Sequence, residues 1–459
     1  MSLAPTLPRA VSQNIREQWL YFNEPQVAAT RLLKRCGPIA PLHFLGRDHV
    51  FVLNADGARQ VFGGDPANYD PYFKEGFISV SGPGTLWAKT GAAHRRERQL
   101  FAPAVHASHF RKHGDTVRSI AQHYINKWQP GQTIKAMDTT LDISRDVIIE
   151  LVFGVQDGPL MDEGREILNQ LRHAVVPIMV FIPQLQKRWF PPWNRFDRAK
   201  NRFTDWVNRL LTHRRTQGAS ADDVLGVMLA TKHEDGSPMR DDEIRDELIT
   251  ILQGGHETTA AVLAWALYEL GQHPEILAKL RAELENSGVV DDPSQIVKLP
   301  YLGAICDETV RLHPILAECA RVLTAPLDIL GHTIPAGNAV VISITAIHHD
   351  PDIYPEPYRF NPERFLERTY SRSEFLPFGG AHRRCIGAAL SEYETRIALA
   401  EIVLRWDFET TAKDRDVRHD VALGPKYGVP LRIIAQRNAH SQLPKTLKLP
   451  SKRMPDKLR

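Results

Sequence analysis

A glycine-rich run around Cys385 constrains this chain of 459 residues more than any other segment. A cysteine that leads into a helix gains support for its thiolate form from the backbone N–H groups and the positive end of that helix. Glycines let the backbone approach a flat ligand closely, and a thiolate is a strong donor to iron. The run therefore predicts a loop that presents the Cys385 thiolate to a flat ligand that carries a metal. It reads Phe378-Gly379-Gly380-Ala381-His382-Arg383-Arg384-Cys385-Ile386-Gly387. A helix is expected after Cys385, with apolar residues at helical spacing at Ile386, Leu390, Tyr393, Ile397, Ala400 and Leu404.

This run resembles the haem-ligand loop of the cytochrome P450 superfamily, whose pattern is Phe-x-x-Gly-x-Arg-x-Cys-x-Gly. The resemblance implies that Cys385 is the axial thiolate ligand of a haem b iron and that Arg383 pairs with an anionic haem edge. It also implies that Phe378 covers the sulfur, while Gly379 and Gly387 let the loop lie close to the haem. Ala381 departs from the pattern, which usually has glycine there. If that position requires a positive φ, alanine costs about 1 kcal/mol.

The same resemblance predicts a mainly α-helical fold with small β-sheets, a triangular helical body around a buried haem. Length alone would suggest about three domains, but no linker, repeat or low-complexity block divides the chain. We therefore expect one haem-thiolate domain over residues 1–437. The remaining residues, 438–459, carry six Lys and Arg side chains and one Asp, which predicts a basic, disordered tail.

Composition narrows the class of protein. Hydrophobic residues make up 43% and charged residues 24% of the chain, as in ordinary globular proteins. A formal charge of +3 is too small to indicate a nucleic-acid partner. The first 22 residues contain no apolar run near 18 residues and no signal-peptide pattern, so we expect no membrane anchor and a cytoplasmic, bacterial-type enzyme. Cys36, Cys306 and Cys319 have no regular spacing and are interpreted as small buried hydrophobic residues.

The apolar pattern places the main elements. Strand-like residues 49–53 precede a short helix near 57–62, and residues from 92 to about 430 are mostly helical. The longest helix is expected from Asp241 to about Gln272, opened by acidic residues and closed before Pro274. Such a helix would extend roughly 48 Å, enough to cross the molecule. Strand patterns return around 326–344 and 421–434.

Inside this long helix lies Gly254-Gly255-His256-Glu257-Thr258-Thr259, where poor helix formers cost roughly 2–3 kcal/mol together. A groove for oxygen beside Gly255 would account for them. Glu257 and Thr258 resemble the superfamily's acid–alcohol pair, which delivers protons during dioxygen activation. The other interpretation is an exposed glutamate beside a threonine hydroxyl that bonds back to a carbonyl.

Two further sets of charged residues extend the resemblance. Glu308 and Arg311 are three apart on a helix, and Arg364 follows in Asn-Pro-Glu-Arg-Phe. The resemblance implies that these three form a buried ion-pair network that braces the haem-ligand loop. It also implies that four residues hold the haem propionates, for which arginine forks are well suited: His94, Arg98, Arg321 and Arg383. His348 and His349 fall in the segment before Pro351 that links the sheet region to the Arg364 loop, and His256 lacks the spacing of a zinc helix, so we expect no second metal.

The primary hypothesis is a haem-dependent monooxygenase that uses O2 and receives electrons from a ferredoxin or flavodoxin with its NAD(P)H-dependent reductase. Alternatives are a haem protein that binds gas or ligand without turnover, and a peroxide-driven peroxygenase or isomerase on the same fold. We expect an apolar substrate such as a terpenoid, steroid or fatty acid, beneath a lid at 173–196. Expected pocket-lining residues are Phe73, Phe77, Ile78, Leu252, Ile315, Leu316 and Tyr427.

Overall fold

The computed structural model describes residues 15–44, 47–174, 176, 179, 182–217, 222–419 and 421–437. Helices dominate these residues. They are α1 (Ile15–Asn23), α2 (Pro25–Cys36), α3 (Ala55–Gly63), α4 (Lys74–Ser81), α5 (Gly91–Phe101), α6 (Ala107–Phe110), α7 (Gly114–Ile125), α8 (Ala136–Leu151), α9 (Pro159–Ala174), α11 (Pro191–Gln217), α12 (Val224–Ala230), α13 (Asp241–Gln272), α14 (Pro274–Asn286), α15 (Pro293–Ile296), α16 (Pro300–Leu312), α17 (Ile344–His348), α18 (Arg364–Glu367) and α19 (Ala388–Arg405).

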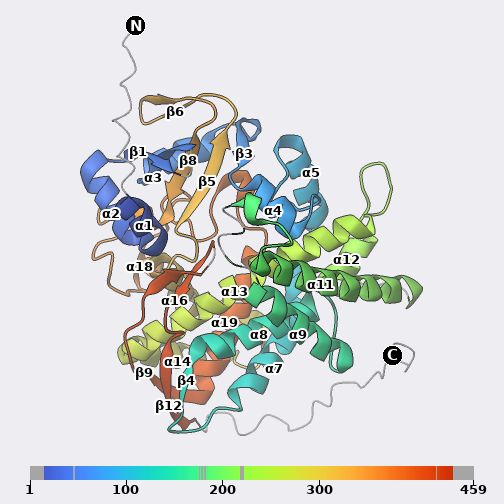
Figure 1. Cartoon of the computed structure of the whole chain (residues 1–459). Helices are drawn as coiled ribbons and strands as arrows, with labels where there is room; N and C mark the ends of the chain where they lie inside the picture. Colours follow the sequence, from blue (N-terminus) through green and yellow to red (C-terminus); the bar gives the residue numbers. More distant parts are fainter. Residues whose placement is uncertain are drawn as a thin grey trace.

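The strands form small sheets. The largest has the order β1-β2-β8-β5-β3, and Figure 1 shows it at the upper left beside α1 and α2. A three-stranded sheet has the order β4-β12-β9, and β6-β7 and β10-β11 form two-stranded sheets. The strands are β1 (Ile39–Phe44), β2 (Arg47–Val52), β3 (Tyr69–Pro71), β4 (Thr133–Lys135), β5 (Glu318–Leu323), β6 (Leu327–Ile329), β7 (His332–Ile334), β8 (Ala339–Ser343), β9 (Trp406–Thr410), β10 (Asp416–Arg418), β11 (Leu423–Pro425) and β12 (Pro430–Gln436).

Helix α13 runs through the middle of the molecule, where it packs against α8, α16 and α19 (Figure 1). Three acidic residues in its first turn complement the positive helix end, and Pro274 starts α14 after it. From Ala260 to Leu270 every residue is buried, as expected of a helix that is covered on all sides. The predicted bounds, 241 to 272, are confirmed.

The predicted fold class, mainly α with small sheets, is also confirmed. The expected strand region around 326–344 contains β6, β7 and β8, but Ile344 begins α17 because the Ser343 side chain accepts the Ala346 N–H as a helix cap. Similarly, the helix after Cys385 begins at Ala388, so Ile386 lies in the loop before it. Five predicted core positions of this helix are buried: Leu390, Tyr393, Ile397, Ala400 and Leu404.

Within the described part of the chain, no helix combines the length and the apolar character needed to cross a bilayer. The predicted tail at 438–459 lies outside the described residues, as do residues 175, 177–178 and 180–181 of the expected lid. The flanking helices α9 and α11 pack against each other, so both ends of that lid segment are anchored on one helix pair.

Candidate active site

The loop before α19 presents Cys385 through its own backbone. The Cys385 N–H donates to the Phe378 carbonyl at 2.9 Å, which closes the loop into a compact turn. Gly379 has a φ of 66°, where glycine carries no steric cost. Gly380 is required for another reason: a Cβ there would lie 2.5 Å from the Phe62 ring of α3. Glycines thus determine both the conformation of the loop and its close packing against α3.

Ala381 has a φ of 55°, so the position that departs from the family pattern does adopt the left-handed conformation. Ala381→Gly removes the cost of this conformation but also gives the unfolded chain more conformational entropy, which offsets part of the gain. We therefore expect the free energy of unfolding to rise by at most about 1 kcal/mol. Chemical denaturation would measure it. The matched control is Ala278→Gly on the exposed face of α14, which should lower the free energy of unfolding by about 1 kcal/mol. A comparable loss at Ala381 would contradict the prediction.

The Cys385 sulfur lies where burial raises its thiol pKa and several nearby groups partly oppose that rise. Cys385 is the exposed one of the four cysteines, yet protein atoms are dense enough around it for burial to raise the pKa of its thiol. Both observations fit a sulfur at the wall of an interior space. Backbone N–H groups of Gly387 and Ala388 and the cations of Arg384 and Arg98 oppose that rise in the pKa.

A cluster of cationic and donor side chains lies beside this loop. His94 and Arg98 come from α5, Arg321 from β5 and Arg383 from the loop itself. Sequence reasoning missed a fifth member, His382, whose ring contacts the His94 ring edge-on with centroids 5.7 Å apart. The predicted propionate set therefore comes together from three separate segments.

This cluster contains mutually repelling groups. Burial, together with Arg383, His382, Arg98 and Arg321, lowers the pKa of His94 to about 3. Burial and Arg321 lower the pKa of Arg383 to about 10, and the Arg383 Nε is buried without a hydrogen-bond partner. Among the described residues, no carboxylate lies within ion-pair distance of His94 or these three arginines. A doubly anionic ligand edge would supply the missing negative charge.

The middle of α13 carries the predicted acid–alcohol pair. The Thr258 hydroxyl donates to the Gly254 carbonyl one turn earlier, at 2.6 Å. Glu257 extends toward α9, where its carboxylate lies 3.8 Å from the Arg172 guanidinium. Arg172 was not predicted, because nothing local in the sequence links positions 85 residues apart. The structure therefore places a hydroxyl and a partly exposed carboxylate on consecutive residues of this helix.

The glycines of α13 allow close packing on two sides. A Cβ at Gly254 would lie 3.2 Å from the Trp87 ring, and one at Gly255 would lie 3.3 Å from the Ile148 side chain. Trp87 also packs on Phe77, with ring centroids 5.0 Å apart, and its carbonyl accepts from Arg383 at 3.5 Å. Trp87, a residue missed by sequence reasoning, thus connects the α13 glycines to the Cys385 loop.

Polar contacts fasten the segment before Trp87 to α13. The Gly84 N–H donates to the Asp246 carboxylate at 2.7 Å, and the Ser81 hydroxyl donates to the Gln253 side chain at 2.7 Å. The hydroxyls of Thr85 and Thr250 share a hydrogen bond of 2.8 Å. The segment 81–85 is consequently held at three successive turns of α13.

Glu308, Arg311 and Arg364 meet in a fully buried network. The Glu308 carboxylate accepts from Arg311 at 2.6 and 2.9 Å and from Arg364 at 3.1 Å. Their side chains are 0%, 0% and 6% exposed, in that order. The Asn361 N–H donates to the same carboxylate at 2.9 Å. Both oxygens of Glu308 accept hydrogen bonds, as a buried carboxylate requires.

His348 connects this network to the Cys385 loop. Its carbonyl accepts from Arg311 at 2.8 Å, and its Nε2 accepts the Leu376 N–H at 2.8 Å. Leu376 lies two residues before Phe378, where the loop begins. Burial, with Arg311 and His349, holds the pKa of His348 well below its usual value, so its ring is a neutral acceptor. His348 is thus a structural histidine in the path from the network to the loop.

The chain matches the family model for cytochrome P450 over residues 5–428. It is 32% identical over 385 residues to a putative cytochrome P450 135A1 of Mycobacterium tuberculosis, covering 83% of this chain and 84% of the relative. It is 31% identical over 415 residues to a putative cytochrome P450 138 of Mycobacterium bovis, covering 87% and 89%. The chain belongs to the cytochrome P450 family. It is therefore a monooxygenase, and membership implies haem with cysteine thiolate ligation and the use of O2.

Solved structures agree on the fold of this cytochrome P450. The retinoic acid-bound cyanobacterial CYP120A1 matches with a TM-score of 0.81 at 22% identity, over 92% of this chain and 96% of that one. The cytochrome P450DA haem domain matches with a TM-score of 0.82 at 21% identity, over 96% and 99%.

The residues present fit a haem. The accessible Cys385 sulfur would supply a thiolate ligand, and the glycines beside it would allow a close backbone approach. The cationic cluster, which has no carboxylate partner among the described residues, would bind two haem carboxylates. Among the residues that the structure describes, no group of three or more His, Cys, Asp or Glu could hold a separate metal ion. His256 of this P450 is buried in α13 and bonds to the Leu141 carbonyl at 2.9 Å, which gives it a structural role.

The predicted pocket-lining residues occupy different environments. Phe73, Phe77 and Ile78 are half-buried on and beside α4, and Leu252 and Ile315 are buried. Leu316 is 38% exposed and Tyr427 51% exposed. The Tyr427 N–H bonds to Asp414, whereas Val421 and Ala422 pack against the main hydrophobic core and β11, which follows them, contacts α13. Sequence reasoning placed these two residues in a strand pattern and did not assign them to the pocket.

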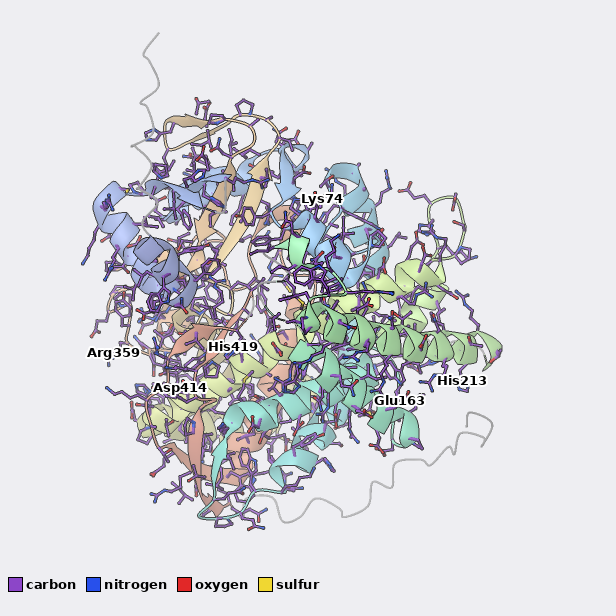
Figure 2. The ribbon with its side chains drawn as sticks, viewed as in Figure 1. Lys74, Glu163, His213, Arg359, Asp414 and His419 are labelled. Atoms are coloured by element: carbon purple, nitrogen blue, oxygen red, sulfur yellow. The ribbon has the colours of Figure 1, made fainter. Side chains whose placement is uncertain are left out.

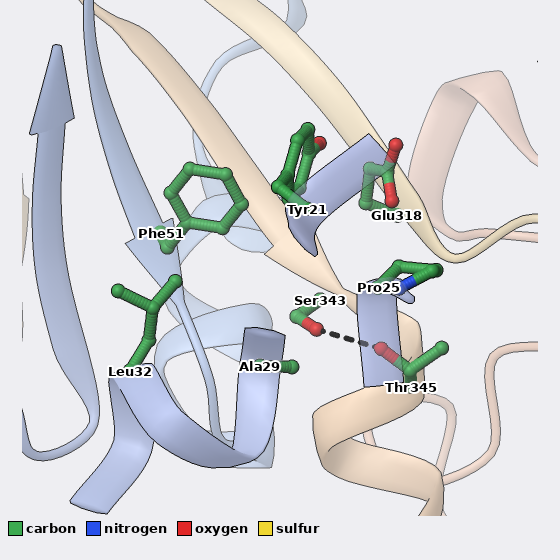
Figure 3. Close-up of a pocket in the computed structure, with 8 residues that line it drawn as sticks. All are labelled: Tyr21, Pro25, Ala29, Leu32, Phe51, Glu318, Ser343 and Thr345. Carbon is green, nitrogen blue, oxygen red and sulfur yellow. Dashed lines mark hydrogen bonds between the residues drawn. The ribbon is translucent and has the colours of Figure 1, made fainter. Parts of the chain in front are cut away.

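A small enclosed cavity lies elsewhere, between α1, α2 and the large sheet (Figure 3). Its volume of about 10 Å³ has room for one water molecule. None of its lining residues belongs to the Cys385 loop or to the α13 glycine segment. The Ser343 and Thr345 hydroxyls on its wall already bond to each other at 3.1 Å, so it is a packing feature of the sheet.

Proposed function

We propose that this enzyme inserts one oxygen atom from O2 into a C–H bond of an apolar small molecule, with Cys385 as the axial ligand of haem b. The observation that carries the proposal is the Cys385 sulfur, which is accessible, supported by two backbone N–H groups and flanked by Arg98 and Arg384. When bound, the haem supplies O2 activation and the oxygen-transfer chemistry. The protein supplies the axial thiolate, orientation, protons and the exclusion of water.

The cationic cluster would hold the haem carboxylates. Arg98, Arg321 and Arg383 each present a fork of donors, and His94 adds one more nitrogen. Gly379 and Gly387 would let the loop backbone lie against the macrocycle, since a Cβ on Gly387 would already approach the Cys385 sulfur to 4.0 Å. Phe378 would shield the sulfur together with Arg384, whose guanidinium lies 5.4 Å from that ring.

Glu257 and Thr258 would move protons to the reacting oxygen. The Thr258 hydroxyl now donates to the Gly254 carbonyl, so its oxygen lone pairs are free to accept from a water molecule. Glu257 reaches partial solvent exposure near Arg172, which suits a group that exchanges protons with the outside. The second oxygen atom would then leave as water.

Thr258→Ala should keep the thiolate spectrum and ligand affinity while product formation falls. Neither ligation by Cys385 nor apolar contact uses that hydroxyl. One lost hydrogen bond in a dry site corresponds to roughly 1–3 kcal/mol, so the yield of product per NADPH should fall about 5- to 150-fold. Water can replace part of the function, which favours the lower half of that range. The measurement is product and peroxide formed per NADPH consumed.

Two variants control this experiment. Thr259→Ala removes the neighbouring hydroxyl, which donates to Ser391 of α19 at 3.1 Å, and should leave the coupling of NADPH to product unchanged. Thr258→Ser keeps a hydroxyl at the same position and should restore much of the coupling. If Thr258→Ala couples normally and forms no extra peroxide, the hydroxyl is only structural, and Glu257 with water carries the protons.

An apolar substrate is supported by the side chains around the site. The aromatic rings of Phe73, Phe77 and Trp87 form a continuous group beside α13, and Ile315 and Leu252 are buried apolar residues. Terpenoids, steroids and fatty acids have the required character. A spectral binding screen with one member of each class would identify the group that binds, because displacement of an iron-bound water changes the haem spectrum.

We infer a separate electron donor, a ferredoxin or flavodoxin with its NAD(P)H-dependent reductase, docking on the basic face near Arg383 and Arg384. Residues 5–428 match the P450 model, and members of this family generally take their electrons from redox partners. Product formation with surrogate partners and NADPH, compared with product formation from hydrogen peroxide alone, tests this. Turnover driven only by peroxide would favour a peroxygenase, and no turnover under either condition would favour a haem-binding protein without catalysis.

A further inference from the structure

A buried histidine at the end of α16 has no part in the chemistry above. His313 occupies the C-terminal cap of that helix, and its ring stacks flat on Trp265 of α13, with centroids 3.9 Å apart and planes at 3°. Its Nε2 bonds to the Glu269 carboxylate of α13 at 2.8 Å, and its Nδ1 bonds to the Asp416 carboxylate of β10 at 3.1 Å. One imidazole thus joins a helix end, the central helix and a hairpin strand.

Both ring nitrogens of His313 face carboxylate oxygens, which only accept hydrogen bonds, so both must carry hydrogen and the ring is an imidazolium. The side chains of His313, Glu269 and Asp416 are 12%, 7% and 21% exposed. Burial would lower the pKa of His313, but Asp416 and Glu269 outweigh it and raise that pKa to about 9. The charged pairs are therefore shielded from solvent and intact at neutral pH.

Other titratable groups around His313 do not compete for this role. His349, after α17, has a pKa lowered to about 3, first by burial, so it stays neutral. Arg311 on the same helix is committed to Glu308, and the Tyr268 hydroxyl of α13 accepts the Asp414 N–H at 3.3 Å. His273 lies 3.5 Å from the other oxygen of Glu269. His313 is the group in contact with both carboxylates.

The hairpin held by Asp416 contacts both an expected pocket residue and α13. In β11, the Leu423 N–H donates to the carbonyl of Ile315, an expected pocket residue, at 2.7 Å. A Cβ on Gly424 would lie 4.0 Å from Ala261 of α13, so the strand lies close to that helix. Asp414 and His419, labelled in Figure 2, come before and after β10 in the chain. A second ion pair, Arg418 with Glu318 at 3.0 Å, anchors the far end of β10 to β5.

We propose that His313, as a buried cation, is a positioning residue for the substrate pocket. It fixes the β10–β11 hairpin and the segment that contains Ile315 against α13. An apolar ligand would then meet a preformed pocket wall. The ligand part of this proposal depends on the proposed function, because the wall is that of the proposed apolar pocket. We call the contacts of His313 with Trp265, Glu269 and Asp416 the His313 clip. The existence of this clip follows from the contacts and does not depend on the proposed function.

The clip should be sensitive to pH in one direction. A histidine whose pKa is higher in the folded state than in the unfolded state stabilises the fold below the unfolded value, near 6.5, and this contribution is lost as the pH rises through about 9. The full difference corresponds to roughly two orders of magnitude in the folding equilibrium constant. His313→Gln removes the charge and should remove this component.

The first experiment measures hydrogen–deuterium exchange of residues 414–425 and denaturant unfolding of the haem-bound protein, at pH 6 to 10. In the wild type, exchange corrected for its intrinsic pH dependence should increase above pH 9. In His313→Gln it should be high at every pH, and the difference in stability between the two proteins should shrink toward zero near pH 10. Asp416→Asn, a milder change at a more exposed side chain, should shift the same observables part of the way. His123→Gln on the exposed face of α7 is the matched control.

The second experiment asks whether the clip shapes the pocket. 4-Phenylimidazole and imidazole both ligate haem iron, but only 4-phenylimidazole also fills apolar space. The ratio of their Kd values therefore measures how well the pocket wall contacts the ligand. His313→Gln and Asp416→Asn should weaken 4-phenylimidazole relative to imidazole by about 3- to 10-fold, equivalent to about 1 kcal/mol of lost contact. The control His123→Gln should leave the ratio unchanged.

The outcomes separate the two proposals. A stability difference between wild type and His313→Gln that does not depend on pH, with unchanged exchange at 414–425, would overturn the clip. Increased exchange with an unchanged Kd ratio would overturn the role in the pocket. Absence of a thiolate spectrum would count against the proposed function and would leave the exchange measurement, which needs no turnover, as a valid test of the clip.

Discussion

Replacing Cys385 with serine is expected to abolish the absorption band of the reduced, carbon monoxide-bound protein at the wavelength that gives the family its name. That band requires a thiolate ligand on the haem iron, which Cys385 would supply. A serine hydroxyl has a far higher pKa than a thiol and stays protonated at neutral pH, so it cannot supply an equivalent anion. Some haem should remain bound, because this substitution leaves Arg98, Arg321 and Arg383 in place, the side chains that we propose bind its carboxylates. The measurement is the difference spectrum, with haem content determined separately.

The other cysteines provide the controls for Cys385→Ser. Cys306 is buried in α16, where burial raises the pKa of its thiol to about 12, and Cys319 is partly buried on β5. Cys306→Ser and Cys319→Ser should keep the band, although each can lower stability. A band that survives in Cys385→Ser would show that another residue is the ligand, and the assignment of the whole loop would then be wrong.

Local patterns in the sequence were sufficient for much of this structure. The bounds of α13 follow from its acidic first turn and from Pro274, and α19 follows from the spacing of its apolar residues. Glu308 and Arg311 could be paired because three residues separate neighbours on one helix face. These features depend on interactions between residues near each other in the chain, so a single sequence contains them.

Contacts between distant segments could not be predicted in the same way. His313 and Asp416 are 103 positions apart, and Gly84 and Asp246 are 162 positions apart. No spacing rule joins such positions, and each residue taken alone reads as an ordinary loop or surface residue. His348 was considered as a metal ligand and rejected on sequence grounds. Its position between Arg311 and Leu376 appeared only when three segments were placed together.

Removal of the Glu308 carboxylate is the other change with a large expected effect. Glu308→Ala leaves the guanidinium groups of Arg311 and Arg364 buried without a counter-charge, and the Asn361 N–H loses its acceptor. Breaking a buried pair in this way costs roughly 3–5 kcal/mol. Typical domains are stable by only about 5–15 kcal/mol, so the variant should unfold readily, expressing as little soluble or haem-depleted protein.

Glu308→Ala should reduce haem retention before it changes the catalytic reaction. Arg311 holds the His348 carbonyl, and His348 holds the Leu376 N–H just ahead of the Cys385 loop, so loss of the network removes support for that loop. Thermal unfolding and the ratio of haem to protein absorbance measure the two effects. Asp56→Ala is the matched control, since Asp56 and Arg59 are also three residues apart but are 70% and 69% exposed, and exposed pairs of this kind contribute at most about 1 kcal/mol. A Glu308→Ala protein that is soluble, haem-replete and unchanged in melting would show that the two arginines find other partners when the carboxylate is absent, and that the loop does not depend on this network.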